Sequence, residues 1–179
     1  MKAGKASFLL ALVLAAFCFF PGGCGAPSEE ARIKEFLKKS VARAEEKQIG
    51  ALMECFSPDY SDFEGRDKAD AERLIGDYLG RFRGIVIHLL SARVDVSGPD
   101  GRASVECEMS FSHGAAEVLR KLIRYAGEFY RFRFDLDKTG KGEWRFAFAE
   151  WQAVDLLDLF PESREILKKL FPDLERIPQ

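Results

Sequence analysis

The sequence has few of the residues that mark the common metal-binding and nucleic-acid-binding classes. Histidine occurs twice and cysteine four times, with no Cys-x-x-Cys pair and no Cys/His spacing typical of a zinc site. There is no block of like charges, and the formal net charge of -2 argues against a basic surface for nucleic acid. No internal repeat or low-complexity tract is present. We therefore expect no metal, no cofactor and no nucleic-acid partner.

Long apolar runs are missing except near the N-terminus, where residues 8–20 are apolar throughout. As a helix this run would span ~20 Å, which is shorter than the ~30 Å hydrocarbon core of a membrane. Lys2 and Lys5 precede the run, and Pro21 follows it. This layout is typical of a secretory signal.

The chain is accordingly divided into three parts. We expect a signal peptide over residues 1–23, a short linker over residues 24–28, and a single folded domain with a C-terminal helical tail over residues 29–179. The length of the last part is that of one ordinary domain with one core.

The end of the leader carries a short motif. Gly22, Gly23 and Cys24 resemble the lipobox of bacterial lipoproteins, although Pro21 stands where leucine is usual. The resemblance implies lipidation of Cys24 and a membrane-anchored domain in the cell envelope, on the periplasmic side in a Gram-negative organism. Two alternatives stay open: ordinary signal cleavage near Gly23 or Ala26, which would free the domain, and retention of the apolar run as an anchor.

Two of the cysteines belong to the expected domain, Cys55 and Cys107. In an oxidising compartment they would be able to pair. We prefer the interpretation that both are buried thiols, because free cysteine behaves as a small apolar residue and is among the most buried residue types.

The first half of the domain shows helical periodicity. Apolar residues recur at helical spacing over residues 28–47, 49–56 and 67–82. Ser28 and Asp67 stand where N-caps are expected. These patterns predict three helices.

The second half alternates with a period of two. Residues 86–96 and 103–112 predict one hairpin, and residues 130–136 and 144–149 predict a second with an aromatic inner face. Between them, residues 115–126 predict a short helical insertion, and a further helix is expected from Pro161. Glu106 and Glu108 lie on the outer face, where we expect them to meet arginines of the neighbouring strand in a solvated ladder.

Helices followed by strands give an α+β fold, with N-terminal helices packed on a curved four-stranded antiparallel sheet. This order, with residues 51–62 after the first helix and residues 143–151 in the last strand, is similar to the nuclear transport factor 2-like superfamily, which includes ketosteroid isomerase-like and polyketide cyclase-like proteins. The resemblance covers residues 28–154. It implies a cone-shaped, cystatin-like roll with a cavity at the wide end.

Several side chains are candidates for lining that cavity. If the strands keep strict alternation, His88 and Glu150 face inward; a bulge in the last strand would turn Glu150 out and Trp151 in. A histidine on an apolar face is either a base or ligand contact, or a core histidine with a partner. The cavity candidates are Tyr60, His88, Phe111, Tyr130, Phe134, Phe148 and Glu150.

Three functions follow from these patterns. The first is a non-catalytic envelope lipoprotein that binds a small apolar molecule, because the inner faces are aromatic and no convincing catalytic set is present. The second is an isomerase, dehydratase or cyclase that uses the same cavity. The third is an interaction domain that forms a homodimer. The resemblance cannot decide among them, because one fold hosts many functions.

Overall fold

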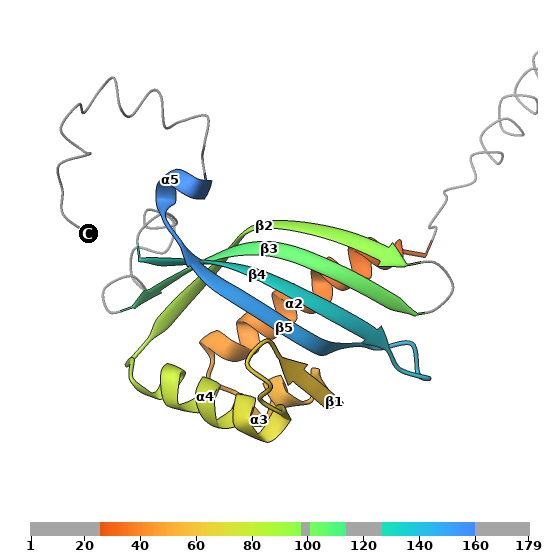
Figure 1. Ribbon diagram of the computed structural model, residues 1–179, viewed down its shortest axis with the longest axis horizontal. Helices are drawn as coiled ribbons and strands as arrows, with labels where there is room; N and C mark the ends of the chain where they lie inside the picture. The colour runs from red at the N-terminus through yellow and green to blue at the C-terminus, as the bar shows by residue number, and fades with distance from the viewer. Residues whose placement is uncertain (1–25, 98–100, 114–126, 160–179) are drawn as a thin grey trace, which may run out of the picture.

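The protein is described here by a computed structural model that covers residues 26–97, 101–113 and 127–159 (Figure 1). The predicted signal peptide, the predicted helix over residues 115–126 and the predicted tail helix from Pro161 lie outside these residues. The helices are α2 (Glu29–Glu45), α3 (Ile49–Met53), α4 (Lys68–Gly80) and α5 (Leu156–Leu159). The strands are β1 (Phe56–Asp62), β2 (Ile85–Ser97), β3 (Arg102–His113), β4 (Glu128–Lys138) and β5 (Trp144–Val154).

The two longest helices begin at the caps expected from the sequence. The Ser28 hydroxyl accepts a hydrogen bond from the backbone N–H of Ala31 at 3.2 Å, and Glu29 lies in the first turn, where a negative charge favours the helix dipole. Asp67 caps α4 in the same way, accepting from the N–H of Asp70 at 2.9 Å. None of the helices in the described ranges has the length and apolar character that a membrane span requires.

The sheet has five strands, in the order β1-β5-β4-β3-β2, so the expectation of four strands was wrong. The additional strand is β1, which pairs with β5 in parallel and irregularly. This strand was not predicted because Pro58 lies inside it. Proline lacks the N–H that a central strand needs, so its presence argues against a strand. An edge strand tolerates proline, and β1 is at the edge.

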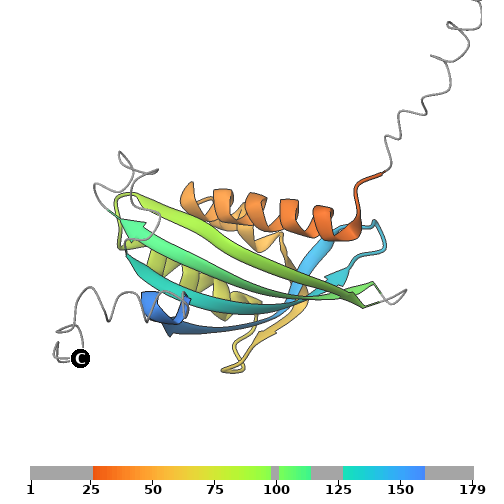
Figure 2. The same cartoon turned by 90° about the horizontal axis from the view of Figure 1, so that it is seen from above.

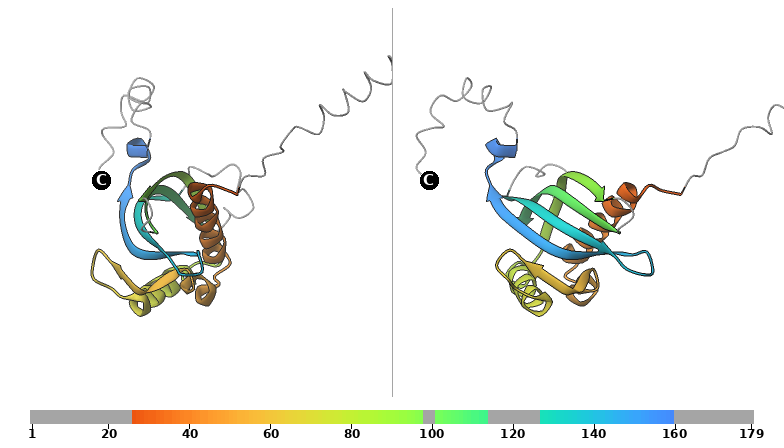
Figure 3. Two further views of the ribbon diagram at one scale, coloured as in Figure 1. Left: turned by 90° about the vertical axis from the view of Figure 1, so that its right-hand side faces the viewer. Right: turned by 45° about the vertical axis from the view of Figure 1, so that its right-hand side comes forward.

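The sheet curves toward α2, which runs lengthwise along its concave side, while α3 and α4 lie near the β1 edge (Figures 2 and 3). Ile33 and Leu37 of α2 are fully buried against this side. Val105 and Leu136 are buried beneath them in the centre of the sheet. The fold is thus a helix-filled, curved α+β roll.

The convex side of the sheet is charged, as the alternation predicts. Arg93, Glu106, Arg133 and Glu150 stand in register across four strands, and all four are exposed. Two residues further along these strands, Arg131 contacts Glu108 at 3.0 Å. Such exposed pairs contribute about 0–1 kcal/mol each, so this ladder serves mainly to keep the convex face in water.

Two bulges change which residues face inward. In β2 the pairing passes from Leu89 to Ser91, which leaves one residue extra in that strand. In β5 it passes from Phe146 to Phe148 while β4 advances by a single residue. Each bulge reverses the alternation beyond it, and strict parity therefore misassigns the flanking side chains.

Candidate functional site

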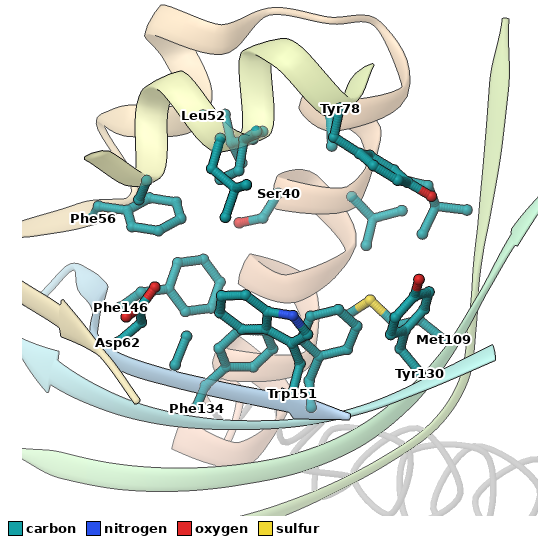
Figure 4. A pocket seen from close by; sticks show the side chains of 18 of the residues that line it. Ser40, Leu52, Phe56, Asp62, Tyr78, Met109, Tyr130, Phe134, Phe146 and Trp151 are labelled. Carbon is teal, nitrogen blue, oxygen red and sulfur yellow. The ribbon is translucent and has the colours of Figure 1, made fainter. Parts of the chain in front are cut away.

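A cavity of about 400 Å³ lies between α2, α4 and the concave face of the sheet. Figure 4 shows side chains of the helices facing side chains of the strands across it. The lining is mostly apolar and rich in rings: Leu37, Ser40, Val41, Ala44, Leu52, Phe56, Tyr60, Asp62, Glu64, Arg66, Ala71, Leu74, Ile75, Tyr78, Leu79, Ile87, Met109, Phe111, Tyr130, Phe132, Phe134, Phe146, Ala149 and Trp151. A space of this size suits a small organic ligand.

The aromatic side chains of the floor are packed against one another. Phe132 stacks on Phe134 with ring centroids 5.4 Å apart, and Phe134 meets Phe146 at 4.8 Å. Phe56 of β1 in turn contacts Phe146 at 5.2 Å. Each ring of the floor is thus packed against its neighbours in the favoured aromatic geometries.

One side of the cavity holds a buried carboxylate. Asp62 is 4% exposed, and its Oδ1 accepts hydrogen bonds from the backbone N–H of Glu64 at 2.9 Å and of Arg66 at 3.0 Å. Its Oδ2 accepts from Arg66 Nε at 2.7 Å. Burial would raise the pKa of Asp62, but these hydrogen bonds and the Arg66 charge together hold it below its usual range.

Arg66, the partner of this carboxylate, has a second acidic neighbour, although its buried Nη2 makes no hydrogen bond within the described residues. Arg66 Nη2 lies 2.6 Å from a Glu64 carboxylate oxygen, and the guanidinium stands 5.2 Å from the centre of the Trp151 ring. The same indole meets Phe63 edge-on at 4.8 Å. Asp62, Arg66 and Trp151 thus form one ordered polar wall.

Near this wall, Tyr60 is 4% exposed and packs edge-on against Phe56. Burial, followed by the nearby Asp62 charge, raises the pKa of Tyr60. The hydroxyl therefore keeps its proton at neutral pH and can donate one hydrogen bond.

The other side of the cavity carries two tyrosines joined by a carboxylate. Tyr78 from α4 and Tyr130 from β4 both donate to Glu128 Oε2, at 3.3 Å and 3.1 Å. Burial is the main cause that raises the pKa of both hydroxyls, and the Glu128 charge adds to it. This link ties the end of α4 to the sheet.

The sequence candidates divide into two groups. Tyr60, Phe111, Tyr130 and Phe134 line the cavity. His88, Phe148 and Glu150 are not among the lining residues.

The two bulges account for this second group. His88 pairs with Ser110. The residues before His88 and before Ser110, Ile87 and Met109, both line the cavity, so His88 and Ser110 face the convex side. In β5, the bulge places Ala149 and Trp151 in the lining and leaves Glu150 exposed. Strict alternation was therefore wrong for Glu150. The alternative stated for the sequence, a bulge that turns Glu150 out and Trp151 in, is the arrangement observed.

Several polar lining residues were not predicted from the sequence, namely Ser40, Asp62, Glu64, Arg66 and Tyr78. Asp62 and Arg66 belong to a strand end and a turn, in a stretch for which the sequence predicts neither a helix nor a strand. Tyr78 lies at an apolar position of the helix predicted over residues 67–82, where only its hydroxyl distinguishes it from a core residue. Spacing of charged residues gave no signal for the Asp62–Arg66 pair.

The two cysteines of the domain are both free and buried. Burial raises the pKa of the Cys107 thiol to about 12, as expected for a small apolar packing residue. Among the described residues there is also no group of three side chains able to hold a metal ion.

Comparison with known proteins gives a fold and no more. No protein-family model matches the sequence, and no curated protein sequence matches it at a significant level. Solved structures do resemble it. Aln2 from a Streptomyces species has a TM-score of 0.59 at 16% identity, over 78% of this chain and 100% of the other.

Two further solved structures resemble this chain and indicate which fold it has. An NTF2-like protein with a cystatin-like fold from Novosphingobium aromaticivorans has a TM-score of 0.55 at 18% identity, over 87% of this chain and 94% of that protein. A provisionally assigned scytalone dehydratase from the same organism has a TM-score of 0.57 at 16% identity, over 71% and 85%. The chain therefore has an NTF2-like, cystatin-like fold, as the resemblance implied.

Proposed function

We propose that this protein binds a small, mainly apolar molecule in its cavity and performs no chemistry on it. The observation that carries the proposal is a space of about 400 Å³ whose walls are mostly rings and aliphatic side chains, with few polar groups among them. Pockets for small molecules have this composition, because apolar walls supply affinity and a few polar groups fix orientation.

The lack of a suitable base in the lining supports the non-catalytic part of the proposal. The chain has two histidines, His88 and His113, and neither lines the cavity. General acid–base catalysis is most efficient when the pKa of the group lies near the working pH. Asp62 has its pKa held low and its oxygens occupied, so it is a poor general base and cannot act as a protonated acid at neutral pH.

An isomerase, dehydratase or cyclase reaction in the same cavity is the alternative. It would require Asp62 to leave Arg66 on substrate binding, because no other carboxylate as buried as Asp62 lines the cavity within the described residues. Leaving Arg66 would break a hydrogen bond to a charged group, which is worth about 1.5–3 kcal/mol. The dehydratase name of one structural neighbour concerns that protein alone.

A fluorescent probe tests the proposal directly. N-phenyl-1-naphthylamine is neutral and apolar, and its emission rises when it leaves water. Ala44 lines the cavity, whereas Ala42 on the same helix is exposed. We expect the wild-type protein to bind the probe and Ala44→Leu to lower the affinity about tenfold by filling the space.

Ala42→Leu is the matched control, since it adds the same atoms to the same helix outside the cavity. It should bind the probe as the wild type does. Native mass spectrometry of the purified protein then reports any molecule that it retains. Absence of probe binding, or equal effects of the two leucines, would contradict the proposal.

We also propose that the domain is exported and held at a membrane through lipidated Cys24, which the lipobox-like motif supports. Cys24→Ser should move the protein from the membrane fraction to the soluble fraction and remove incorporation of labelled palmitate. Export without lipidation would leave both variants in the soluble fraction.

A homodimer is the remaining proposal for a partner. Light scattering on the purified protein distinguishes monomer from dimer. The charged convex ladder, with Arg93, Glu106, Arg133 and Glu150 in register, makes this face a poor candidate for a stable interface, because the cores of such interfaces are depleted in charge.

A further inference from the structure

The polar groups around the cavity mostly offer acceptors. The Ser40 hydroxyl donates its proton to the Phe36 carbonyl at 3.0 Å. Tyr78 and Tyr130 donate theirs to the same Glu128 oxygen. A hydroxyl has one proton, so each of these three oxygens has only lone pairs left for a ligand.

The charged donor in the described lining faces two carboxylates. Arg66 donates from Nε to Asp62 over 2.7 Å, and its Nη2 lies 2.6 Å from a Glu64 carboxylate oxygen without making a hydrogen bond in the part of the chain that the structure describes. Because these two carboxylates already balance the guanidinium charge, an anionic ligand would have to compete with them. Tyr60 remains as a hydroxyl able to donate.

The charge balance points in the same direction. Asp62, Glu64 and Arg66 are the lining residues that carry charge, which gives an excess of one negative charge. Glu128, an exposed residue that accepts from both tyrosines, adds another beside them. Among the described residues, Arg81 is a positive group near Tyr78 that opposes this charge, and it is exposed as well.

The rings beside the tyrosine pair suit a cation. Phe111 meets Tyr130 at 5.5 Å and Tyr78 at 6.2 Å, edge to face in both pairs. Figure 4 shows Tyr78 and Tyr130 at the same side of the cavity, away from Asp62. Aromatic faces attract ammonium groups, most strongly where water is excluded.

We infer that the ligand is a hydrophobic amine, an apolar body with one ammonium group that donates to the oxygens of Tyr78 and Tyr130 in front of Glu128. This inference rests on the proposed binding function. The apolar body would lie on the floor of Phe132, Phe134 and Phe146.

Three compounds of ten carbons each test the head group. At neutral pH decylamine carries a positive head, 1-decanol a neutral head and decanoate a negative head. Each is titrated against the purified protein loaded with N-phenyl-1-naphthylamine. We expect decylamine to displace the probe at about tenfold lower concentration than decanoate, with decanol between them. Equal or tighter binding of decanoate would overturn the inference.

A pair of variants locates the amine. Glu128→Gln removes the charge behind the tyrosines, and Glu106→Gln removes the same charge from the convex face, where it is exposed. Glu128→Gln should weaken decylamine about fivefold and leave decanol unchanged, whereas Glu106→Gln should change neither. A loss shared by all three compounds would mean that Glu128 only supports packing, and it would overturn the assignment.

The two proposals fail in different ways. If the probe does not bind to the wild type, the cavity is not a binding site and the proposed function falls. If the probe binds and decanoate displaces it best, the binding function stands and the amine does not.

Discussion

Arg66 donates from Nε to the Asp62 carboxylate over 2.7 Å, and this carboxylate is almost completely removed from water. The pair joins the end of β1 to the turn that precedes α4. A buried carboxylate of this kind is stable only while its hydrogen bonds are made, because a buried charge without partners is very costly. The wall of the cavity therefore depends on this ion pair and on the backbone N–H groups that donate to Asp62.

Replacement of the carboxylate by an amide measures that dependence. Asp62→Asn keeps the shape but removes the charge, and it should lower the free energy of unfolding by about 1–3 kcal/mol. Urea denaturation checks this. Asp59→Asn on the same strand is the control, because Asp59 is exposed and should change stability by less than about 0.5 kcal/mol. Equal effects would show that the pair contributes nothing.

The same pair predicts how stability depends on pH. The pKa of Asp62 is lowered in the folded protein relative to an unfolded value of about 3.9, so its contribution is complete above about pH 5 and is lost as the pH falls through the folded pKa. The stability difference between wild type and Asp62→Asn should therefore be constant from pH 7 to about pH 5 and shrink below about pH 4. Urea midpoints of both proteins at each pH give this difference. A difference that grows on acidification would contradict it.

Much of the fold follows from pattern alone. The caps at Ser28 and Asp67 and both hairpins were predicted, because local hydrogen bonding and period-two alternation encode them directly. The missed strand β1 was not, since its partner β5 lies far away in the chain and Pro58 masks it. Parallel pairing of this kind has no local signal.

The site was harder to predict than the fold for a related reason. One-residue bulges in β2 and β5 turn His88 and Glu150, respectively, to the convex face. A bulge is defined by pairing with a neighbouring strand, so alternation within one strand does not reveal it. The ring-bearing candidates Phe111, Tyr130 and Phe134 lie in β3 and β4, outside the two bulged strands, and line the cavity. The Asp62–Arg66 pair needed the path of a turn, which composition does not give.

Substitutions in the core and at the cavity should affect stability and binding differently. Leu136 is 1% exposed in the core and does not line the cavity, whereas Leu74 is 39% exposed at its rim. Leu136→Ala should lower the free energy of unfolding by about 2–5 kcal/mol, because it leaves an unfilled volume. Leu74→Ala should cost less than about 1 kcal/mol and yet weaken the binding of N-phenyl-1-naphthylamine. Urea denaturation and probe titration of both variants check this, and a Leu74 variant as unstable as the Leu136 variant would contradict it.

The Cys107 thiol provides a test of the packed centre of the sheet. Cys107 is 1% exposed, and burial raises its pKa to about 12, so the thiol stays protonated at pH 8. Because the thiolate is the reactive form, iodoacetamide should leave Cys107 unmodified in the native protein and modify it rapidly in concentrated urea. Mass spectrometry of the peptide that contains Cys107 follows the reaction. Cys107→Ala, which lacks the site, gives the background for that peptide. Native modification as fast as modification in urea would mean that β3 opens readily, and the rigid cavity floor beside it would then have to be reconsidered.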